Sequence, residues 1–506
     1  MNIVKMLEVN AARHPWKEAI IYQDRHYTYD EFNGIVNQLA HGLIARGVAK
    51  GDKVALMMKN SDYFAIAYYA CAKIGAVLVP INFRLLANEL NYILTQSDAK
   101  HIISDTEFEE VILQAISNHV PIQNLVSVPQ AKHEAFTSVL DLLSENKENT
   151  GVELTGTDDL HILYTSGTTG FPKGAVFDHD RVKDVALQFI LTLGYHAEER
   201  MMNFAPLFHC AQLTIGLISG LYVGGLSVIY REFKPREILA DIGKYKITTF
   251  LAVPTMHLAF LQIPKQDDFD FSTMEKYTYG SAPMSEHVVR KCMEYFGSHQ
   301  FYSLCGQTEG GPNGILLYPK DHERQAGMAG RESSAFTIFD IVNTDGHSTK
   351  PGEVGEFIVK GPTVMREYYK NPQATAETIR DGWLYTGDLA VRDEENYVKL
   401  VDRKKDMIIT GGENVYSVEV ENVLGMHPAI AEAAVIGTPD PKWGELVTAV
   451  VVAKAGESLS EQAIIDYAKQ HVAGYKVPRK VIFADSLPRN ASGKLLKYQL
   501  REKVNA

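Results

Sequence analysis

The chain has 506 residues, which is too long for one ordinary hydrophobic core, so we expect two or three domains. Its 50 basic and 62 acidic side chains give a net charge of −12, which argues against a protein that neutralises nucleic-acid phosphates over a wide surface. The four cysteines lie far apart and form no CxxC pair, so the sequence indicates neither a disulfide framework nor a structural zinc site.

The N-terminal half alternates between predicted helices and strands. A capping box at Thr28 and Glu31 begins a helix that ends at Gly47, and further helices are expected at 62–74 and 89–94. Strands are predicted at 54–58, 77–79, 101–104, 160–164, 249–253 and 276–279. This alternation is typical of a doubly wound α/β fold, in which ligands bind at the carboxyl ends of the strands.

Two segments of this region depart from the alternation. Residues 110–157 turn polar and predict a surface connection. Residues 213–230 carry no charge and are just long enough to suggest a transmembrane helix. Because glycines interrupt this run, we expect a buried helix, a glycine turn and a buried strand instead. The N-terminus carries charges where a secretory signal needs an unbroken apolar stretch, so we expect a cytoplasmic protein without a transmembrane segment.

From about residue 335 the pattern changes to short antiparallel strands, predicted at 336–342, 355–361 and 396–403. A compact α+β unit follows. Its predicted elements are a helix at 418–424, strands at 433–436 and 448–452, a helix capped by Ser458 and Glu461, and a last helix at about 493–503. The predicted fold class is therefore α/β. Residues 1–401 form a large domain of doubly wound sheets with a small β-barrel-like subdomain, and residues 402–506 form a small C-terminal domain.

The loop after the strand at 160–164 has an unusual composition. Residues 164–176 read YTSGTTGFPKGAV, with three glycines, four Ser and Thr hydroxyls and one lysine. Backbone N–H groups free of Cβ hindrance can surround a phosphate, and a lysine offsets part of its charge. The spacing matches neither the nucleoside-triphosphatase loop nor the dinucleotide-binding pattern. Taken alone, this stretch is compatible both with a phosphate site and with an ordinary mobile surface loop.

Five further motifs follow this loop in a fixed order. They are TYGSAPM (278–284), YSLCGQTEGG (302–311), GWLYTGDLA (382–390), VDRKKDMIITGGENVYSVEVE (401–421) and PRNASGKLLKYQLR (488–501). With these six motifs the chain resembles, over nearly its whole length, the adenylate-forming superfamily of acyl-CoA synthetases, luciferases and peptide-synthetase adenylation domains. The resemblance implies an acid–thiol ligase that converts a carboxylic acid to an acyl-adenylate with ATP and then to a thioester with coenzyme A.

The resemblance assigns the phosphate contacts. Residues expected to hold the leaving β- and γ-phosphates are Thr165, Ser166, Gly167, Thr168, Thr169, Gly170 and Lys173. Thr308 resembles the donor to the α-phosphate, and Glu309 resembles the ligand of Mg²⁺, which suits hard carboxylate oxygen. The alternative for Glu309 is an ordinary solvated loop acid.

The same resemblance assigns the nucleoside contacts. Gly280, Ser281 and Ala282 resemble the strip that packs against adenine, while Asp388 and Arg403 resemble the two contacts to the ribose. Where the family usually has a tyrosine that stacks on the base, this chain has Cys305. Adenine stacking is therefore in doubt at that position.

Further site residues are expected in the C-terminal domain. Lys494 lies in the expected first turn of the last helix, where the helix dipole disfavours a cation, which indicates a functional role. In the family this lysine bridges the substrate carboxylate and the α-phosphate. Gly411, Gly412 and Glu413 resemble the loop lining the pantetheine tunnel, and Tyr475 and Lys476 resemble neighbours of the coenzyme A nucleotide. The resemblance also implies that the C-terminal domain rotates about a hinge at Asp402, and Ser417 is expected to cap the helix that follows.

The identity of the acid stays open at this point. His209 resembles the family residue at the mouth of the acyl pocket, with a core histidine as the alternative, and the small residues Cys210, Ala211 and Gly216 suggest room for an elongated acyl group. The pattern most resembles compact bacterial fatty-acyl-CoA synthetases. Cinnamate- or benzoate-type acids, or loading of a carrier protein, are alternatives. A non-catalytic nucleotide-binding protein would need neither Lys494 nor Glu309. We expect no nucleic-acid partner, and the sequence leaves open peripheral membrane contact and a homodimer.

Overall fold

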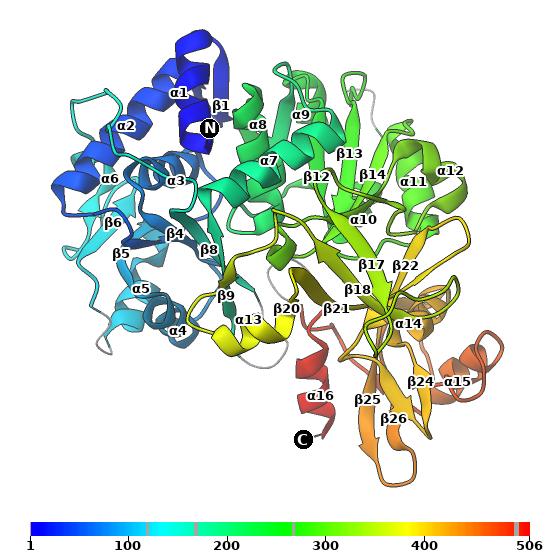
Figure 1. The fold of residues 1–506 in the computed structure, drawn as a ribbon. Coiled ribbons are helices and arrows are strands. Elements are labelled where there is room, and N and C mark those ends of the chain that lie inside the picture. The colour runs from blue at the N-terminus through cyan, green and yellow to red at the C-terminus, as the bar shows by residue number, and fades with distance from the viewer. Residues whose placement is uncertain (1, 118–120, 166–170, 266–268, 490–494, 506) are drawn as a thin grey trace.

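The computed structural model describes residues 2–117, 121–165, 171–265, 269–489 and 495–505. These residues form four sheets with helices packed around them (Figure 1). Two large sheets make up most of the N-terminal part, and a small sheet near β17 and β21 leads to the C-terminal domain. The predicted α/β class, with a large N-terminal domain and a small C-terminal one, is confirmed.

The first large sheet is parallel except at one edge. Its strands, in spatial order, are β7 (Thr137–Ser138), β6 (Asn124–Val128), β5 (Ala99–Asp105), β3 (Lys53–Met57), β4 (Val77–Pro80), β8 (Asp159–Thr165), β9 (Lys173–Asp178) and β19 (Glu367–Tyr368). The last two run antiparallel to their neighbours. The connecting helices are α2 (Tyr29–Ala45), α3 (Asp62–Ile74), α4 (Ala87–Ser97), α5 (Glu109–Ile116) and α6 (Val139–Leu142).

Local sequence signals explain the first helices of this sheet. The Thr28 hydroxyl accepts a hydrogen bond from the Glu31 N–H at 3.3 Å, and the Thr28 N–H donates to the Glu31 carboxylate at 2.8 Å, so the predicted capping box is present. The expectation for residues 110–157 is wrong, because β6, β7 and α6 continue the sheet there. Val126 and Val128 bury their side chains in β6, but five residues within a polar stretch give too short a pattern to recognise.

The second large sheet has β2 (Arg25–Thr28), β1 (Glu18–Tyr22), β11 (Leu226–Ile229), β10 (Arg200–Asn203), β12 (Thr249–Ala252), β13 (Lys276–Gly280), β14 (Phe301–Gly306), β15 (Gly314–Leu317) and β16 (Glu332–Ser333) in spatial order. Helices on this side are α1 (Ile3–Arg13), α7 (His179–Leu193), α8 (Ser219–Val223), α9 (Pro235–Lys244), α10 (Pro254–Leu261), α11 (Glu286–Phe296) and α12 (His322–Gln325). In Figure 1, α7 runs between the two large sheets. It contacts β8 and β9 on one side and the π-helical turn Gln212–Ile218 on the other.

The uncharged run at 213–230 belongs to the protein core. The π-helical turn continues into α8, Gly224 ends the helix with φ +84°, and β11 follows as a buried strand. The predicted sequence of helix, glycine turn and strand is thus confirmed. In the described parts of the chain, no helix has both the length and the apolar character needed to span a bilayer.

The third sheet is antiparallel, as predicted. It contains β17 (Ile338–Val342), β18 (Gly355–Lys360), β21 (Trp383–Arg392), β20 (Ile379–Arg380) and β22 (Val398–Arg403), with α13 (Pro372–Thr378) between β19 and β20. The C-terminal sheet follows, with β23 (Ile408–Thr410), β24 (Glu413–Val415), β25 (Ile430–Asp440), β26 (Gly444–Ala453) and β27 (Lys480–Phe483). Its helices are α14 (Ser417–Gly425), α15 (Glu461–Lys469) and α16 (Lys497–Asn505).

Three predicted helix starts in the C-terminal domain are wrong. Ser460 caps α15 by accepting from the Ala463 N–H, in place of Ser458. Ser417 lies inside α14, where Tyr416 is the N-cap, and its hydroxyl serves another contact described below. The last helix begins at Lys497, so position 494 precedes the helix and the dipole argument for Lys494 does not hold. Lys494 itself lies outside the described residues.

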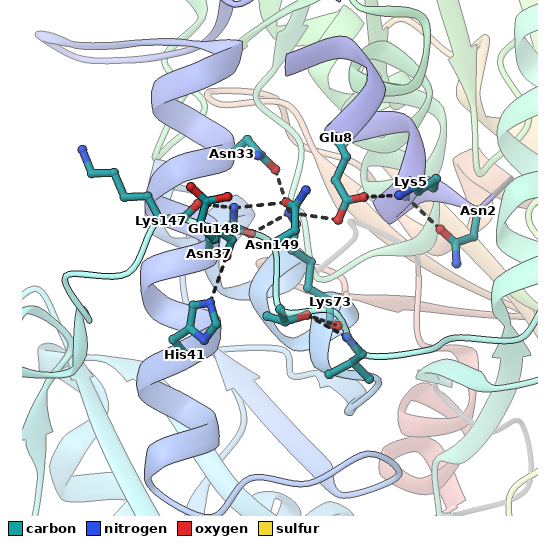
Figure 2. Close-up of polar contacts among 12 residues, drawn as sticks. Asn2, Lys5, Glu8, Asn33, Asn37, His41, Lys73, Lys147, Glu148 and Asn149 are labelled. Atoms are coloured by element: carbon teal, nitrogen blue, oxygen red, sulfur yellow. Dashed lines mark hydrogen bonds and ion pairs between the residues drawn. The ribbon is translucent and has the colours of Figure 1, made fainter. Parts of the chain in front are cut away.

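A buried lysine joins the N-terminal helices at the amino edge of the first sheet. Figure 2 shows Lys73, at the end of α3, surrounded by three asparagine side chains. Its ammonium donates to Oδ1 of Asn33, Asn37 and Asn149 at 2.7, 2.6 and 2.8 Å, and Glu8 lies at 3.4 Å. Burial lowers the pKa of Lys73 to about 8 despite the attraction of Glu8. This cluster holds α1, α2, α3 and the segment before β8 together, at the edge opposite the predicted site.

Candidate active site

The loop predicted to hold phosphate joins two antiparallel strands. Thr165 ends β8 and Lys173 begins β9 directly opposite it, where the Thr165 hydroxyl donates to the Lys173 carbonyl at 3.5 Å. Residues 166–170 lie outside the described residues, so five predicted contacts there, Ser166, Gly167, Thr168, Thr169 and Gly170, have no structural account. The two ends of the loop are nevertheless fixed at the carboxyl end of β8.

Tyr368 connects the lysine of this loop to the predicted metal ligand. The strand β19 pairs with β9, which places the Tyr368 ring 4.4 Å from the Lys173 ammonium. The Tyr368 hydroxyl donates to Oε1 of Glu309 at 2.7 Å. Burial, with a smaller contribution from the Glu309 carboxylate, raises the pKa of Tyr368, so its hydroxyl stays protonated and acts as a donor at neutral pH.

Thr308 and Glu309 lie together in a 3₁₀ turn after β14. The Thr308 hydroxyl contacts Sγ of Cys210 at 3.2 Å, and Sγ lies 3.9 Å from Nδ1 of His209. Burial raises the pKa of the Cys210 thiol to about 12, so it is neutral. A continuous series of contacts therefore runs from Lys173 through Tyr368, Glu309, Thr308 and Cys210 to His209, across both large sheets.

The Glu309 carboxylate suits a hard divalent cation. One oxygen is held by Tyr368, and among the residues that the structure describes no group bonds the other. The side chain is half-buried, so part of it remains accessible. A carboxylate with one fixed and one open oxygen fits Mg²⁺, which prefers few protein carboxylates beside phosphate oxygens.

The strip predicted to contact adenine lies beside β14. A Cβ atom on Gly280 would lie 2.2 Å from the Leu304 carbonyl oxygen of the adjacent strand, so the strands fit together only with glycine there. Ser281 has φ +65°, in the left-handed region, and both Ser281 and Ala282 are exposed. The strip thus presents backbone and small side chains at the carboxyl edge of the second sheet.

The two predicted ribose contacts lie opposite each other in register. Asp388 on β21 pairs with Arg403 on β22, and Arg403 Nε lies 2.5 Å from Asp388 Oδ1. Cys305, near the end of β14, packs against the apolar core of the third sheet. Burial raises the pKa of the Cys305 thiol to about 12, and the nearby Asp388 adds to this. Cys305 therefore lies beside the predicted nucleoside contacts as a neutral, partly buried group.

The glycine pair of the C-terminal domain forms a hairpin turn. Gly411 and Gly412 join β23 to β24, with φ values of +60° and +85°, and all three exposed residues from Gly411 to Glu413 lie at the tip. A Cβ on Gly411 would approach the Trp443 ring to 2.9 Å, whereas one on Gly412 would meet open space. The turn therefore requires positive φ at both positions, a local reason for glycine that is independent of the predicted tunnel.

The two predicted neighbours of coenzyme A, Tyr475 and Lys476, differ in exposure and in their contacts. Tyr475 is 38% exposed, whereas Lys476 pairs with both oxygens of Glu419 on α14 at 2.8 Å. Lys476 is therefore already neutralised in this arrangement.

Asp402 joins the third sheet to the C-terminal domain. It is 6% exposed at the end of β22, and its carboxylate accepts from the N–H and hydroxyl of Ser417 at 2.5 and 2.7 Å. Burial raises the pKa of Asp402, against the attraction of Lys497 and the hydrogen bonds from Ser417. The predicted hinge residue thus fixes the first turn of α14 in this arrangement.

Sequence reasoning missed Tyr368 and the packing role of Gly216. Tyr368 lies in a two-residue strand, 59 residues from Glu309, and only its place in the short aromatic segment REYYK could have drawn attention to it. A Cβ on Gly216 would meet Oδ1 of Asn203 and Nε2 of Gln212 at 2.3 Å each. Gly216 therefore allows Asn203 and Gln212 to pack closely against the backbone, a local reason for glycine that is independent of the predicted acyl pocket.

Comparison with known proteins shows which family models and relatives this chain matches. The AMP-binding enzyme family model matches residues 7–369, and the AMP-binding enzyme C-terminal domain model matches residues 419–494. The long-chain-fatty-acid–CoA ligase FadD13 of Mycobacterium tuberculosis is 37% identical over 511 residues, covering 100% of this chain and 99% of the relative. Feruloyl-CoA synthase of Amycolatopsis is 36% identical, covering 97% of this chain and 96% of the relative.

A solved structure shows the same fold. O-succinylbenzoate coenzyme A synthetase (MenE) from Bacillus subtilis, in complex with ATP and magnesium ion, aligns with a TM-score of 0.87 at 31% identity and covers 98% of each chain. Full-length identity above 30% to named CoA ligases accompanies the two family models, which follow each other along the chain. The chain therefore belongs to the AMP-binding enzyme family and to its acyl-CoA synthetase branch, which confirms the predicted enzyme class, an acid–thiol ligase.

Proposed function

We propose that this protein activates a carboxylic acid with ATP and Mg²⁺ to an acyl-adenylate, and transfers the acyl group to coenzyme A with release of AMP. A medium- or long-chain fatty acid is the proposed substrate. The observation that carries the proposal is the series of contacts from Lys173 to His209, because it brings a phosphate-loop cation, a carboxylate, a hydroxyl and the predicted acyl-pocket histidine to one edge.

The proposed chemistry follows from the groups present. A substrate carboxylate oxygen attacks the α-phosphorus of ATP, and the bond to the β-phosphate oxygen breaks, releasing pyrophosphate. Lys173 and the N–H groups of its loop would stabilise the leaving pyrophosphate, and the Thr308 hydroxyl would donate to the α-phosphate. Glu309 would hold Mg²⁺, which supplies positive charge to the phosphate oxygens. Lys494 would stabilise the charge that develops between the carboxylate and the α-phosphate.

The second step is assigned to the C-terminal domain. The coenzyme A sulfur attacks the acyl carbon and AMP leaves, with Gly411 and Gly412 lining the approach of the thiol. We propose that residues 402–506 rotate against residues 1–401 about Asp402 between the two steps. Support comes from the position of Asp402 between the two matched family segments and from its bonds to α14.

Relatives support more than one acid. The 37% identity to a long-chain-fatty-acid ligase favours a fatty acid, but the 36% identity to a feruloyl-CoA synthase keeps an aryl acid as the second candidate. A fatty acid–[acyl-carrier-protein] ligase, ScoC of Streptomyces coeruleorubidus, is 34% identical over 99% of this chain, so a carrier protein is a third candidate acceptor.

Acid-dependent pyrophosphate release tests the proposal. Acids of graded chain length from acetate to palmitate are compared with benzoate, cinnamate and ferulate, with coenzyme A or a carrier protein as acceptor. Activity should rise from acetate towards octanoate or longer, because each buried methylene contributes about 0.8 kcal/mol of favourable transfer. If acetate or an aryl acid is used at least as efficiently as every fatty acid, the fatty-acyl assignment is wrong.

A further inference from the structure

We propose that Tyr368 is a positioning residue that couples the metal ligand Glu309 to the phosphate-loop cation Lys173. The inference rests on the proposed function, since it concerns the same ATP site. Tyr368 is 4% exposed, so we place its effect on the substrates in its contacts with these two residues. One tyrosine side chain therefore orients both the Glu309 carboxylate and the Lys173 ammonium. In the proposed reaction, both of these charged groups act on the phosphates of ATP.

The hydroxyl determines which Glu309 oxygen faces a cation. It donates to Oε1 at 2.7 Å and thereby fixes the rotation of the carboxylate. The Met365 N–H donates to the Glu309 carbonyl oxygen at 2.8 Å, so the segment leading to β19 holds both the backbone and the side chain of Glu309. Among the described residues nothing bonds Oε2, so this oxygen is left for a metal ion and its direction is set before the ion arrives.

The ring face determines where the Lys173 ammonium lies. The ammonium sits 4.4 Å from the ring centroid, within the range of a cation–π interaction. This contact places the positive charge without neutralising it, as a carboxylate partner would. Lys173 therefore keeps its full charge for a phosphate while its flexible side chain is held in place.

The tyrosine itself is held by its strand. Tyr368 pairs with Ala175 of β9, its N–H donates to the Thr375 hydroxyl at 2.9 Å, and the next N–H, of Tyr369, donates to the Gly174 carbonyl at 2.7 Å. The strand pairing and the Tyr369 bond tie β19 to the strand that carries Lys173, and the Thr375 bond ties β19 to α13. The ring is thus a rigid link between the two large sheets.

The neighbouring residue provides a matched control. Tyr369 also donates its hydroxyl to a carboxylate, Asp98 Oδ2 at 2.8 Å, and its ring also lies near a lysine ammonium, Lys370 at 5.6 Å. These contacts lie at the surface, away from Glu309. Tyr369→Phe therefore removes the same kind of hydrogen bond without touching the proposed ATP site.

Calorimetric titration of ATP, with Mg²⁺ and separately with EDTA, tests the proposal in the full-length protein. With Mg²⁺ present, Tyr368→Phe should weaken ATP binding on the order of tenfold, because the hydrogen bond to the Glu309 carboxylate is lost. With EDTA, the same variant should weaken ATP binding less than about twofold. Tyr368→Leu should weaken binding in both conditions, because the ring contact to Lys173 is lost as well. Tyr369→Phe should behave as the unaltered protein, and all variants are measured where circular dichroism shows them folded.

Three results are distinguishable. Equal ATP binding by Tyr368→Phe and Tyr369→Phe in Mg²⁺ would overturn the inference for the hydroxyl. Unchanged binding of ATP in EDTA by Tyr368→Leu would overturn it for the ring. The unaltered protein could also bind ATP while none of the tested acids leads to pyrophosphate release. In that case the proposed function fails, while the inference about Tyr368 at the ATP site stands.

Discussion

The two parts of the candidate site differ in how their residues are held. At the carboxyl edges of the large sheets, Lys173, Glu309, Thr308 and Cys210 are joined to one another through direct contacts and through Tyr368. In the C-terminal domain, Gly411 contacts Trp443 and Lys476 pairs with Glu419, both within that domain. We therefore propose that the adenylating groups on the large sheets are assembled in advance. Lys494 and the groups proposed for thioester formation lie in the C-terminal domain and would have to be brought to the substrate.

Replacing Lys494 by alanine is expected to have the largest effect and to sharpen this comparison. If Lys494 stabilises the developing charge in the first step alone, acyl-adenylate formation should fall by about 10²- to 10³-fold. Thioester formation from supplied acyl-adenylate and coenzyme A should be unchanged. Pyrophosphate release and thioester yield measure the two steps, and Lys503→Ala, an exposed lysine on α16, is the control.

Asp402→Pro should affect the opposite step. Proline fixes φ, so rotation of the C-terminal domain should be hindered and thioester formation should fall on the order of tenfold or more. Adenylate formation should persist if the adenylating orientation stays accessible.

Asp402→Ala is the matched control for this change, because it removes the carboxylate that holds Ser417 without fixing the backbone. Were alanine and proline to slow thioester formation equally, the effect would come from the lost hydrogen bonds and the hinge assignment would be wrong.

Gly412→Ala tests whether the hairpin turn acts in the second step. Alanine at positive φ lowers the free energy of unfolding by about 1–2 kcal/mol. Gly456→Ala in the same domain should lower it equally, because Gly412 and Gly456 both have φ near +85° and open space around them. Thioester formation should fall on the order of tenfold only for Gly412→Ala. A melting curve checks the shared stability cost, and equal activity of the two variants would show that the turn has only a structural role.

Cys305→Tyr should have the smallest effect and concerns only the preassembled part. A tyrosine that stacks on adenine contributes roughly 0.5–1.5 kcal/mol beyond burial, so the KM for ATP should fall by about 2- to 12-fold. Thioester formation from supplied acyl-adenylate should be unaffected. A higher KM would mean that Cys305 is fitted to the packed core of the third sheet and that the base is held by other groups.

Local patterns in the sequence predicted most of the fold. The helix from Tyr29 was predicted because its capping box and apolar spacing lie within a few residues of each other. β6 and β19 were missed because five and two residues carry too little periodicity, and their pairing partners determine their conformation. Ser458 and Ser460 offer similar caps two residues apart, and only the completed helix decides between them.

The candidate site likewise contains residues that local motifs indicate and one residue that only the strand pairing reveals. Candidate site residues such as Thr308, Asp388 and Arg403 could be proposed from the sequence because the family pattern is contiguous around each of them. Tyr368 could not, because its role depends on a strand pairing that brings residues 173, 309 and 368 together. The predicted start of the last helix at about residue 493 was wrong, because the described helix begins at Lys497.

Measuring both half-reactions on the same preparations of Lys494→Ala and Asp402→Pro tests the central claim most directly. Pyrophosphate release reports the first step, and thioester yield from synthetic acyl-adenylate reports the second. A crossed result is predicted, in which Lys494→Ala loses only the first step and Asp402→Pro only the second. Equal loss of both steps in both variants would contradict the proposal that the C-terminal domain supplies Lys494 to the first step and its glycine turn to the second by rotating about Asp402.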